Sequence, residues 1–211
     1  MAKIKAIIFD VCGVLALDKR KDAAKYNRRV LGVHEYVAKK LKISLDQYFD
    51  SIDTDYTKSM AGEISEEKVV KEIAANFKIT PKKLKKLYLG AYESHFKQNE
   101  QLFKELSKLE KQGYILAVLS DQWHLSEDPL MPKKLYKRFG VLIVSCDVGL
   151  RKPDPKIYKL VLKKLKLKPS QTVFVDNQEW NLKPARKLGM KAIQFKNNKQ
   201  LFQDLKELGI E

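Results

Sequence analysis

The sequence contains little cysteine and no long hydrophobic run. Its 211 residues include two cysteines, Cys12 and Cys146, which are too few for a disulfide framework and lack the spacing of a zinc-binding motif. No apolar run approaches the roughly eighteen residues that a membrane-spanning helix needs. These absences exclude a disulfide-stabilised fold and predict that the protein has no membrane partner.

Arginine is also scarce, although the chain is strongly basic. Only six of the 42 basic residues are arginine, and the formal net charge is +16. Lysine along helices is typical of solvated faces, and it lacks the planar guanidinium fork that reads bases. A basic protein attracts polyanions in general, but the sequence contains no nucleic-acid-binding motif. We therefore expect no specific nucleic-acid partner.

The chain starts with a short apolar segment that ends at an aspartate. The apolar run over residues 6–9 is too short for a signal peptide, and Asp10 follows it directly. This pattern is typical of a buried strand, so the expected location is cytoplasmic.

Five short apolar runs are typical of buried parallel strands. They cover residues 4–9, 115–119, 142–145, 173–175 and 192–195. Helical stretches separate the later runs and cover residues 102–109, 156–165 and 180–188. The alternation predicts an α/β fold with a doubly wound parallel sheet and right-handed crossovers.

Residues 18–99 interrupt this alternation, because they show helical periodicity and no strand pattern. Ser44, Ser65 and Thr80 are candidate helix N-caps. Pro81 directly after Thr80 strengthens the last of these helix starts. We therefore expect a small helical bundle inserted after the first strand.

Polar side chains follow four of the predicted strands. They are Asp10 and Cys12 after the first strand, Ser120 and Asp121 after the second, Lys152 after the third, and Asp176 and Asn177 after the fourth. In open α/β sheets, ligands bind at the carboxyl ends of the strands. These side chains are therefore the candidate functional site.

In this order, the four segments resemble the signature motifs of the haloacid dehalogenase superfamily. They read DVCGV at residues 10–14, SD at 120–121, GLRKPDP at 149–155 and DNQEWN at 176–181. Residues 62–65, GEIS, resemble a segment common in the helical caps of this group. The third and fourth motif regions are most similar to the branch that holds sugar-phosphate phosphatases and the N-terminal domain of soluble epoxide hydrolases.

The resemblance implies a Rossmann-like core of residues 1–17 and 99–211 with a helical cap of residues 18–98. It also implies a magnesium-dependent phosphatase that acts on a small phosphorylated metabolite. Neither the substrate nor the oligomeric state follows from the motifs.

The resemblance assigns catalytic and substrate-binding roles. Asp10 is the expected nucleophile, which forms an aspartyl-phosphate. Lys152 supplies a positive charge to Asp10 and the phosphate, while Ser120 and the backbone N–H of Asp121 bind phosphate oxygens. Because magnesium prefers hard oxygen ligands, the expected metal ligands are Asp10, the Cys12 carbonyl, Asp176 and Asn177.

Cys12 departs from the family pattern. Phosphatases of the family usually carry a second aspartate here, which protonates the leaving group and then activates water. A thiol is a poor base at neutral pH. A weak or inactive phosphate-binding or interaction protein therefore stays open, as do dehalogenase and phosphonate hydrolase chemistry. A dehalogenase needs no metal, so Asp176 argues against it, and a phosphonate hydrolase needs a Schiff-base lysine in the cap.

The remaining candidate side chains carry weaker signals. His34 and His95 lie on predicted helices of the insertion, where packing or solvation explains them. Trp123 and His124 follow the second motif, and Trp180 lies within the fourth, so they either wall the pocket or pack in the core.

Overall fold

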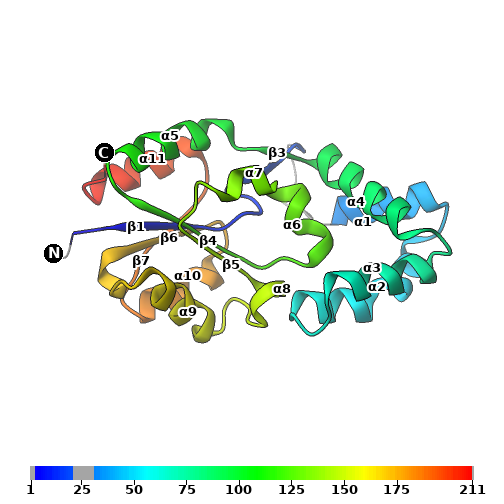
Figure 1. Ribbon diagram of the computed structural model, residues 1–211. Helices are drawn as coiled ribbons and strands as arrows, with labels where there is room; N and C mark the ends of the chain where they lie inside the picture. The colour runs from blue at the N-terminus through cyan, green and yellow to red at the C-terminus, as the bar shows by residue number, and fades with distance from the viewer. Residues whose placement is uncertain (1–2, 21–30, 211) are drawn as a thin grey trace.

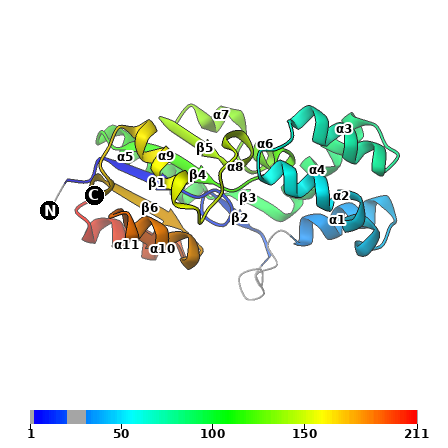
Figure 2. The ribbon, with the colours of Figure 1, turned by 90° about the horizontal axis from the view of Figure 1, so that it is seen from below.

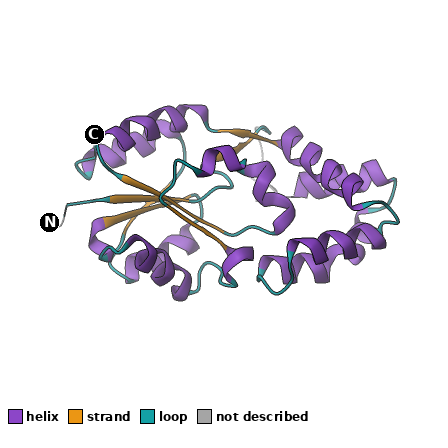
Figure 3. Ribbon diagram, in the orientation of Figure 1, coloured by secondary structure: helices purple, strands orange, loops and turns teal. Residues whose placement is uncertain are grey.

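The structure is a computed structural model, and it describes residues 3–20 and 31–210 (Figure 1). A five-stranded sheet lies at its centre, with helices around it (Figure 3). The strands are β1 (Ala6–Phe9), β4 (Ile115–Ser120), β5 (Val141–Val144), β6 (Thr172–Asp176) and β7 (Lys191–Gln194). All neighbouring pairs are parallel, in the order β5-β4-β1-β6-β7. The five predicted strands are therefore confirmed, with shifts of one or two residues at their ends.

Helices cover both faces of this sheet, as the doubly wound prediction requires (Figure 1). Side chains alternate between the two faces along β1, so Ile7 and Phe9 join one apolar cluster and Ala6 and Ile8 join the other. The first cluster is covered by α5 (Glu100–Lys111) and α11 (Asn198–Glu207). The second is covered by α9 (Pro155–Leu165) and α10 (Glu179–Lys187).

Shorter elements complete the core, and the sequence pattern did not predict them. They are α6 (His124–Leu130), α7 (Lys133–Tyr136), α8 (Ser145–Val148) and the 3-10 helix η1 (Pro169–Gln171). Such short helices carry too few residues for a clear hydrophobic period.

Four helices lie beyond the carboxyl ends of the strands (Figure 2). They are α1 (Leu31–Leu41), α2 (Leu45–Met60), α3 (Glu66–Asn76) and α4 (Pro81–His95). The predicted N-caps are confirmed, because the side chains of Ser44, Ser65 and Thr80 each accept a backbone N–H of the helix that follows. The residues of this segment form the insertion that the sequence predicts after the first strand.

A short antiparallel ribbon connects this insertion to the sheet region. It pairs β2 (Ala16–Asp18) with β3 (Phe96–Gln98). The prediction of no strand in residues 18–99 is therefore wrong at β3. The ribbon has three residues per strand, and its partners lie far apart in the sequence, so no local pattern marks it. After it, the buried Asn99 ties the chain back to the first motif by donating Nδ2–H to the Val14 carbonyl at 2.9 Å.

Among the described residues, no helix combines the length and apolar character needed to cross a membrane.

Candidate active site

A cavity of about 290 Å³ lies between the carboxyl ends of the strands and the helices α2 and α4. It brings together residues from all four predicted motifs. The sheet side contributes Asp10, Cys12, Asp121, Gln122, Arg151, Lys152, Gln178, Trp180 and Asn181. The opposite side contributes Tyr56 and Met60 of α2, Tyr92 of α4, and Trp123, which directly precedes α6.

Three buried charged side chains lie at or directly behind the floor of this cavity, which Asp10 and Lys152 line. Lys152 Nζ lies 2.9 Å from Asp10 Oδ1 and 2.7 Å from Asp176 Oδ2. The side chains of Lys152, Asp10 and Asp176 are 2%, 8% and 0% exposed, so water screens these charges little. A buried charge is costly unless it is paired. One ammonium between two carboxylates leaves a net negative charge, which favours a further cation.

Asp10 stands directly at the end of β1. Its backbone N–H donates to the Val175 carbonyl at 2.9 Å, which continues the parallel pairing with β6. Burial, together with the nearby carboxylate of Asp176, raises the pKa of Asp10 to about 6, although Lys152 opposes the shift. At neutral pH the group is ionised, and its raised basicity suits a nucleophile.

Lys152 is held from both ends. Its backbone N–H donates to Asp121 Oδ1 at 3.0 Å, and its ammonium bridges the two carboxylates. Burial lowers the pKa of Lys152, but Asp10, Asp176 and Asp121 together raise it above its ordinary value. The side chain therefore remains a fixed positive charge beside Asp10, and its predicted role toward a phosphate remains a prediction.

The oxygens of Asp176 accept three hydrogen bonds. Oδ1 accepts the backbone N–H of Gln178 at 2.7 Å, while Oδ2 accepts both Lys152 Nζ and Asn181 Nδ2, at 2.7 and 3.0 Å. Asp176 is not among the residues that line the cavity. In this arrangement it positions Lys152. Asn181 closes the DNQEWN segment and had no assigned role before the structure placed it here.

Ser120 and Asn177 also lie behind the cavity surface. Ser120 is fully buried, and its Oγ accepts Gln122 Nε2 at 3.3 Å. Asn177 Oδ1 is buried without a hydrogen-bond partner. Buried amide oxygens normally have a donor or bind a cation or water. The predicted phosphate role of Ser120 and metal role of Asn177 remain predictions.

The residues fit a hard divalent cation. Asp10 offers a carboxylate oxygen, and Cys12, two residues later, offers its backbone carbonyl. The local charge is negative, and Asn177 Oδ1 is buried without a hydrogen-bond donor. These observations support a magnesium site with Asp10, the Cys12 carbonyl and Asn177. Within the described part of the chain, Asp176 Oδ1 accepts only the Gln178 N–H, so it retains a lone pair, and the predicted metal role of Asp176 remains a prediction.

Aromatic side chains form the opposite wall of the cavity. Trp123 is buried, and its Nε1–H donates to Tyr92 Oη at 2.9 Å. The rings of Tyr56 and Tyr88 pack on it, each with centroids 4.9 Å away. Trp180 also lines the cavity but is 52% exposed. Both tryptophans therefore wall the pocket, which was one of the two expectations from the sequence.

The histidines lie elsewhere. His34 is buried, and its Nδ1 lies 2.6 Å from Tyr48 Oη, which confirms packing. His95 Nδ1 lies 2.9 Å from the Ala91 carbonyl of its own helix. His124 does not line the cavity and bonds Ser59 of α2.

The sequence reasoning missed several residues that line the cavity. Tyr56, Met60 and Tyr92 occupy helical positions that are typical of core packing, and only the placement of α2 and α4 shows that they face a cavity. Arg151 immediately precedes Lys152 in the third motif, so its place in the sequence could have indicated that it lies near the cavity.

Comparison with known proteins identifies relatives across most of the chain. The family model for haloacid dehalogenase-like hydrolases matches residues 4–189. Bifunctional epoxide hydrolase 2 of Rattus norvegicus is 35% identical over 115 residues, which are 52% of this chain and 21% of that protein. Glyceraldehyde 3-phosphate phosphatase of Pyrococcus furiosus is 31% identical over 108 residues, or 48% of this chain and 43% of the relative. The chain thus spans less than half of either relative.

A solved structure shares the fold. It is a HAD family enzyme of Bacteroides thetaiotaomicron in complex with magnesium and inorganic phosphate, with a TM-score of 0.68 and 20% sequence identity. The match covers 94% of this chain and 99% of the other.

Proposed function

Because the chain belongs to the haloacid dehalogenase-like hydrolase family, we propose that it is a magnesium-dependent phosphatase of a small phosphorylated metabolite. The observation that carries this proposal is the buried ion-pair arrangement in which Lys152, at the floor of the cavity, bridges Asp10 beside it and Asp176 behind it. Relatives named as phosphatases, and a similar fold that holds magnesium and phosphate, support the same chemistry.

Asp10 is the nucleophile in this proposal. One of its carboxylate oxygens attacks the phosphorus, the bond to the leaving oxygen breaks, and an aspartyl-phosphate forms. Water then attacks the phosphorus and releases inorganic phosphate and free Asp10. Lys152 stabilises the phosphoryl charge during both steps, and Asp176 with Asn181 keeps the ammonium in place.

Magnesium would be held by Asp10, the Cys12 carbonyl and Asn177, with Asp176 as a further candidate. When bound, it neutralises phosphate charge so that a carboxylate can approach. Ser120 and the Asp121 N–H are the proposed phosphate contacts, and the exposed Arg151 adds positive charge to the cavity.

The helices of residues 18–98 act as a cap in this proposal. Tyr56, Met60 and Tyr92 close the cavity opposite Asp10, so they exclude water and select the part of the substrate beyond the phosphate. A volume of about 290 Å³ suits a small molecule.

Cys12 favours a second candidate function, which is phosphate binding with little turnover. The side chain lines the cavity where relatives of this fold usually place an acid–base aspartate. General acid–base groups typically contribute about 10²- to 10⁴-fold to the rate. Without one, the aspartyl-phosphate would hydrolyse slowly.

The test is phosphate release from a panel of aryl, sugar and triose phosphates, with and without magnesium, by wild type and Asp10→Asn. We expect magnesium-dependent turnover that Asp10→Asn abolishes. Asp154→Asn is the matched control, because Asp154 is an exposed helix cap in the same region. Activity that survives Asp10→Asn would contradict the proposal, and phosphate binding without turnover would select the second function.

A further inference from the structure

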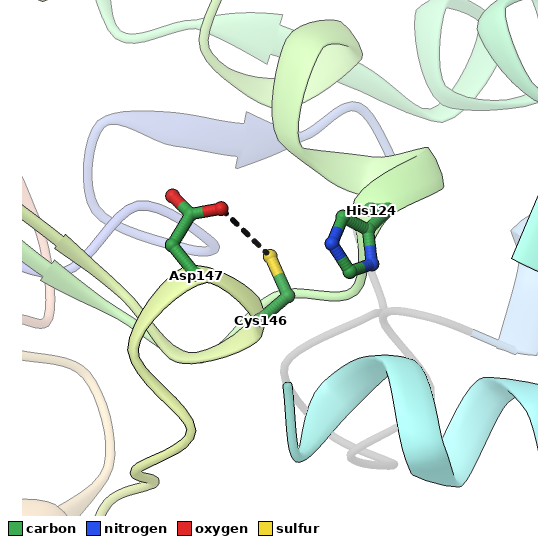
Figure 4. A group of neighbouring side chains, drawn as sticks. All are labelled: His124, Cys146 and Asp147. Carbon is green, nitrogen blue, oxygen red and sulfur yellow. Dashed lines mark hydrogen bonds between the residues drawn. The ribbon is translucent and has the colours of Figure 1, made fainter. Parts of the chain in front are cut away.

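A second group of metal-ligating side chains lies outside the cavity (Figure 4). It joins His124 at the start of α6 to Cys146 and Asp147 of α8, and one ligand atom from each lies within 4.8 Å of the others. Glu127, one turn along α6, places Oε2 at 3.9 Å from Cys146 Sγ. Three potential ligands of three chemical types therefore come together, and a second carboxylate lies beside the thiol.

The imidazole of His124 is already oriented for ligation. Its Nδ1 lies 2.7 Å from Ser59 Oγ, and the same hydroxyl accepts the His124 backbone N–H at 3.0 Å. This leaves Nε2 as the ligating nitrogen, and Figure 4 shows a ring nitrogen turned toward Cys146 and Asp147. Metal-bound histidines characteristically have their other nitrogen held by such a partner.

The second carboxylate is held in a similar way. Glu127 Oε1 accepts the hydroxyl of Tyr136 at 2.7 Å, so Oε2 remains directed at Cys146. These contacts restrict the His124 ligand and the neighbouring Glu127 carboxylate before any ion arrives, which lowers the entropy cost of binding.

The charge of the group calls for a cation. In a chain with 42 basic residues, none of the ion pairs among residues 3–20 and 31–210 involves Glu127 or Asp147. The two carboxylates instead face a buried thiol, and Cys146 Sγ lies 4.0 Å from Asp147 Oδ1. A divalent ion would neutralise this excess negative charge.

The spacing is close to that of a tetrahedral metal centre. Zinc binds thiolate sulfur at about 2.3 Å and carboxylate oxygen at about 2.1 Å, which puts the two ligand atoms about 3.6 Å apart. The separation of 4.0 Å between Cys146 Sγ and Asp147 Oδ1 needs a contraction of a few tenths of an ångström, and a His124 ring nitrogen lies within 4.8 Å of both ligand atoms. A mixed sulfur, nitrogen and oxygen set favours zinc over magnesium or calcium.

We propose that His124, Cys146 and Asp147 form a zinc site that joins α6 to α8, with the fourth position left to solvent and the Glu127 carboxylate beside the thiol. None of the three ligands lines the cavity, so the site is separate from the proposed phosphatase chemistry. It would stabilise the contact between the end of α2 and the core. There the Ser59 hydroxyl contacts His124, and Gly62, at φ +68°, packs so closely that a Cβ would lie 2.8 Å from Gly149 backbone atoms.

The experiment measures zinc and cobalt binding by the full chain after dialysis against a chelator. We expect one equivalent of zinc per chain, a higher melting temperature with zinc, and a thiolate-to-cobalt absorption band. Cys146→Ser and His124→Gln should abolish the band. Asp147→Asn, at an exposed position, should weaken zinc binding at least about tenfold without loss of fold.

Two controls make the result specific. Asp128→Asn alters an exposed carboxylate next to Glu127, and we expect it to leave zinc affinity unchanged. Asp10→Asn should also leave it unchanged, which separates this site from the cavity. Wild type that binds no zinc, or a cobalt band that persists in Cys146→Ser or disappears in Asp10→Asn, would overturn the proposal.

Discussion

The two walls of the cavity satisfy their buried polar groups in different ways. On the sheet side, Lys152 bridges the carboxylates of Asp10 and Asp176. On the helical side, neutral groups pair with each other: Trp123 Nε1–H donates to Tyr92, and behind this wall the hydroxyls of Tyr48 and Tyr88 lie 2.6 Å apart. The charged wall can perform chemistry on a phosphate, whereas the neutral wall can exclude water from it.

Burial acts on both walls but has opposite consequences. It raises the pKa of Tyr88 and of Tyr92, so these hydroxyls stay neutral and keep their hydrogen bonds. On the other wall, burial raises the pKa of Asp10, but the ammonium of Lys152 opposes the shift and the group still ionises near neutral pH. The ammonium of Lys152 therefore accounts for the difference between a wall that carries ionised groups and a wall that stays neutral.

The largest expected effect is on the charged wall, when its one ammonium is removed. Lys152→Met leaves two buried carboxylates without their positively charged partner, and breaking a buried ion pair in this way costs about 3–5 kcal/mol. Urea denaturation at pH 8 measures the loss in the free energy of unfolding. Lys156→Met, at an exposed lysine on α9, is the control and should change stability by less than about 0.5 kcal/mol. Equal stability of the two variants would contradict the role of Lys152.

A second prediction restores the acid–base group that the charged wall lacks. Cys12→Asp should raise turnover by about 10²-fold or more, most strongly for alkyl phosphates, whose poor leaving groups need a proton. Cys12→Asn, of similar size but without a titrating group, should give no increase. Steady-state hydrolysis of an aryl and an alkyl phosphate measures the effect. Brisk alkyl turnover by wild type that Cys12→Asp slows would place the acid–base function elsewhere.

The pH dependence of the charged wall follows from Asp10. Its pKa of about 6 in the folded protein lies above the ordinary 3.8, so folding favours the protonated form. This contribution to stability is complete below pH 4 and is lost as the pH rises through 6. Activity has the opposite sign, because the nucleophile must be ionised. We expect kcat/KM to fall about tenfold per pH unit below 6. A flat profile down to pH 4.5 would contradict this assignment.

The smallest predicted effect belongs to the neutral wall. Tyr92→Phe removes the acceptor of the buried Trp123 N–H, and an unsatisfied donor costs about 1–3 kcal/mol. Thermal or urea denaturation measures this loss. In Tyr114→Phe, the control, the hydroxyl removed has a single long contact of 3.5 Å, to Gly209 at the surface, so we expect little change. If both variants lose the same stability, the Trp123 contact contributes nothing specific.

Many of the strands and helices could be predicted because the sequence patterns that mark them are local. The apolar run before Asp10 and the caps at Ser44, Ser65 and Thr80 depend on neighbours within a few residues, and the structure has these elements where they were expected. Placement of the site at the strand ends follows from the parallel sheet, because its carboxyl ends meet at one edge. The sequence by itself therefore determined the sheet, the insertion and the meeting of Asp10 with Lys152.

Tertiary structure decided the features that join distant residues. The β2–β3 ribbon pairs strands that lie about eighty residues apart in the sequence. Tyr92 and Asp10, which line opposite sides of the cavity, are separated by a similar distance along the chain. Asp176 is expected from the sequence to hold metal, and the structure adds that its Oδ2 accepts both the Lys152 ammonium and the Asn181 amide. His124 and Cys146 show no metal spacing in the sequence and meet only because α6 and α8 pack together. In each case the deciding contact joins residues whose separation along the chain leaves no periodic or local trace.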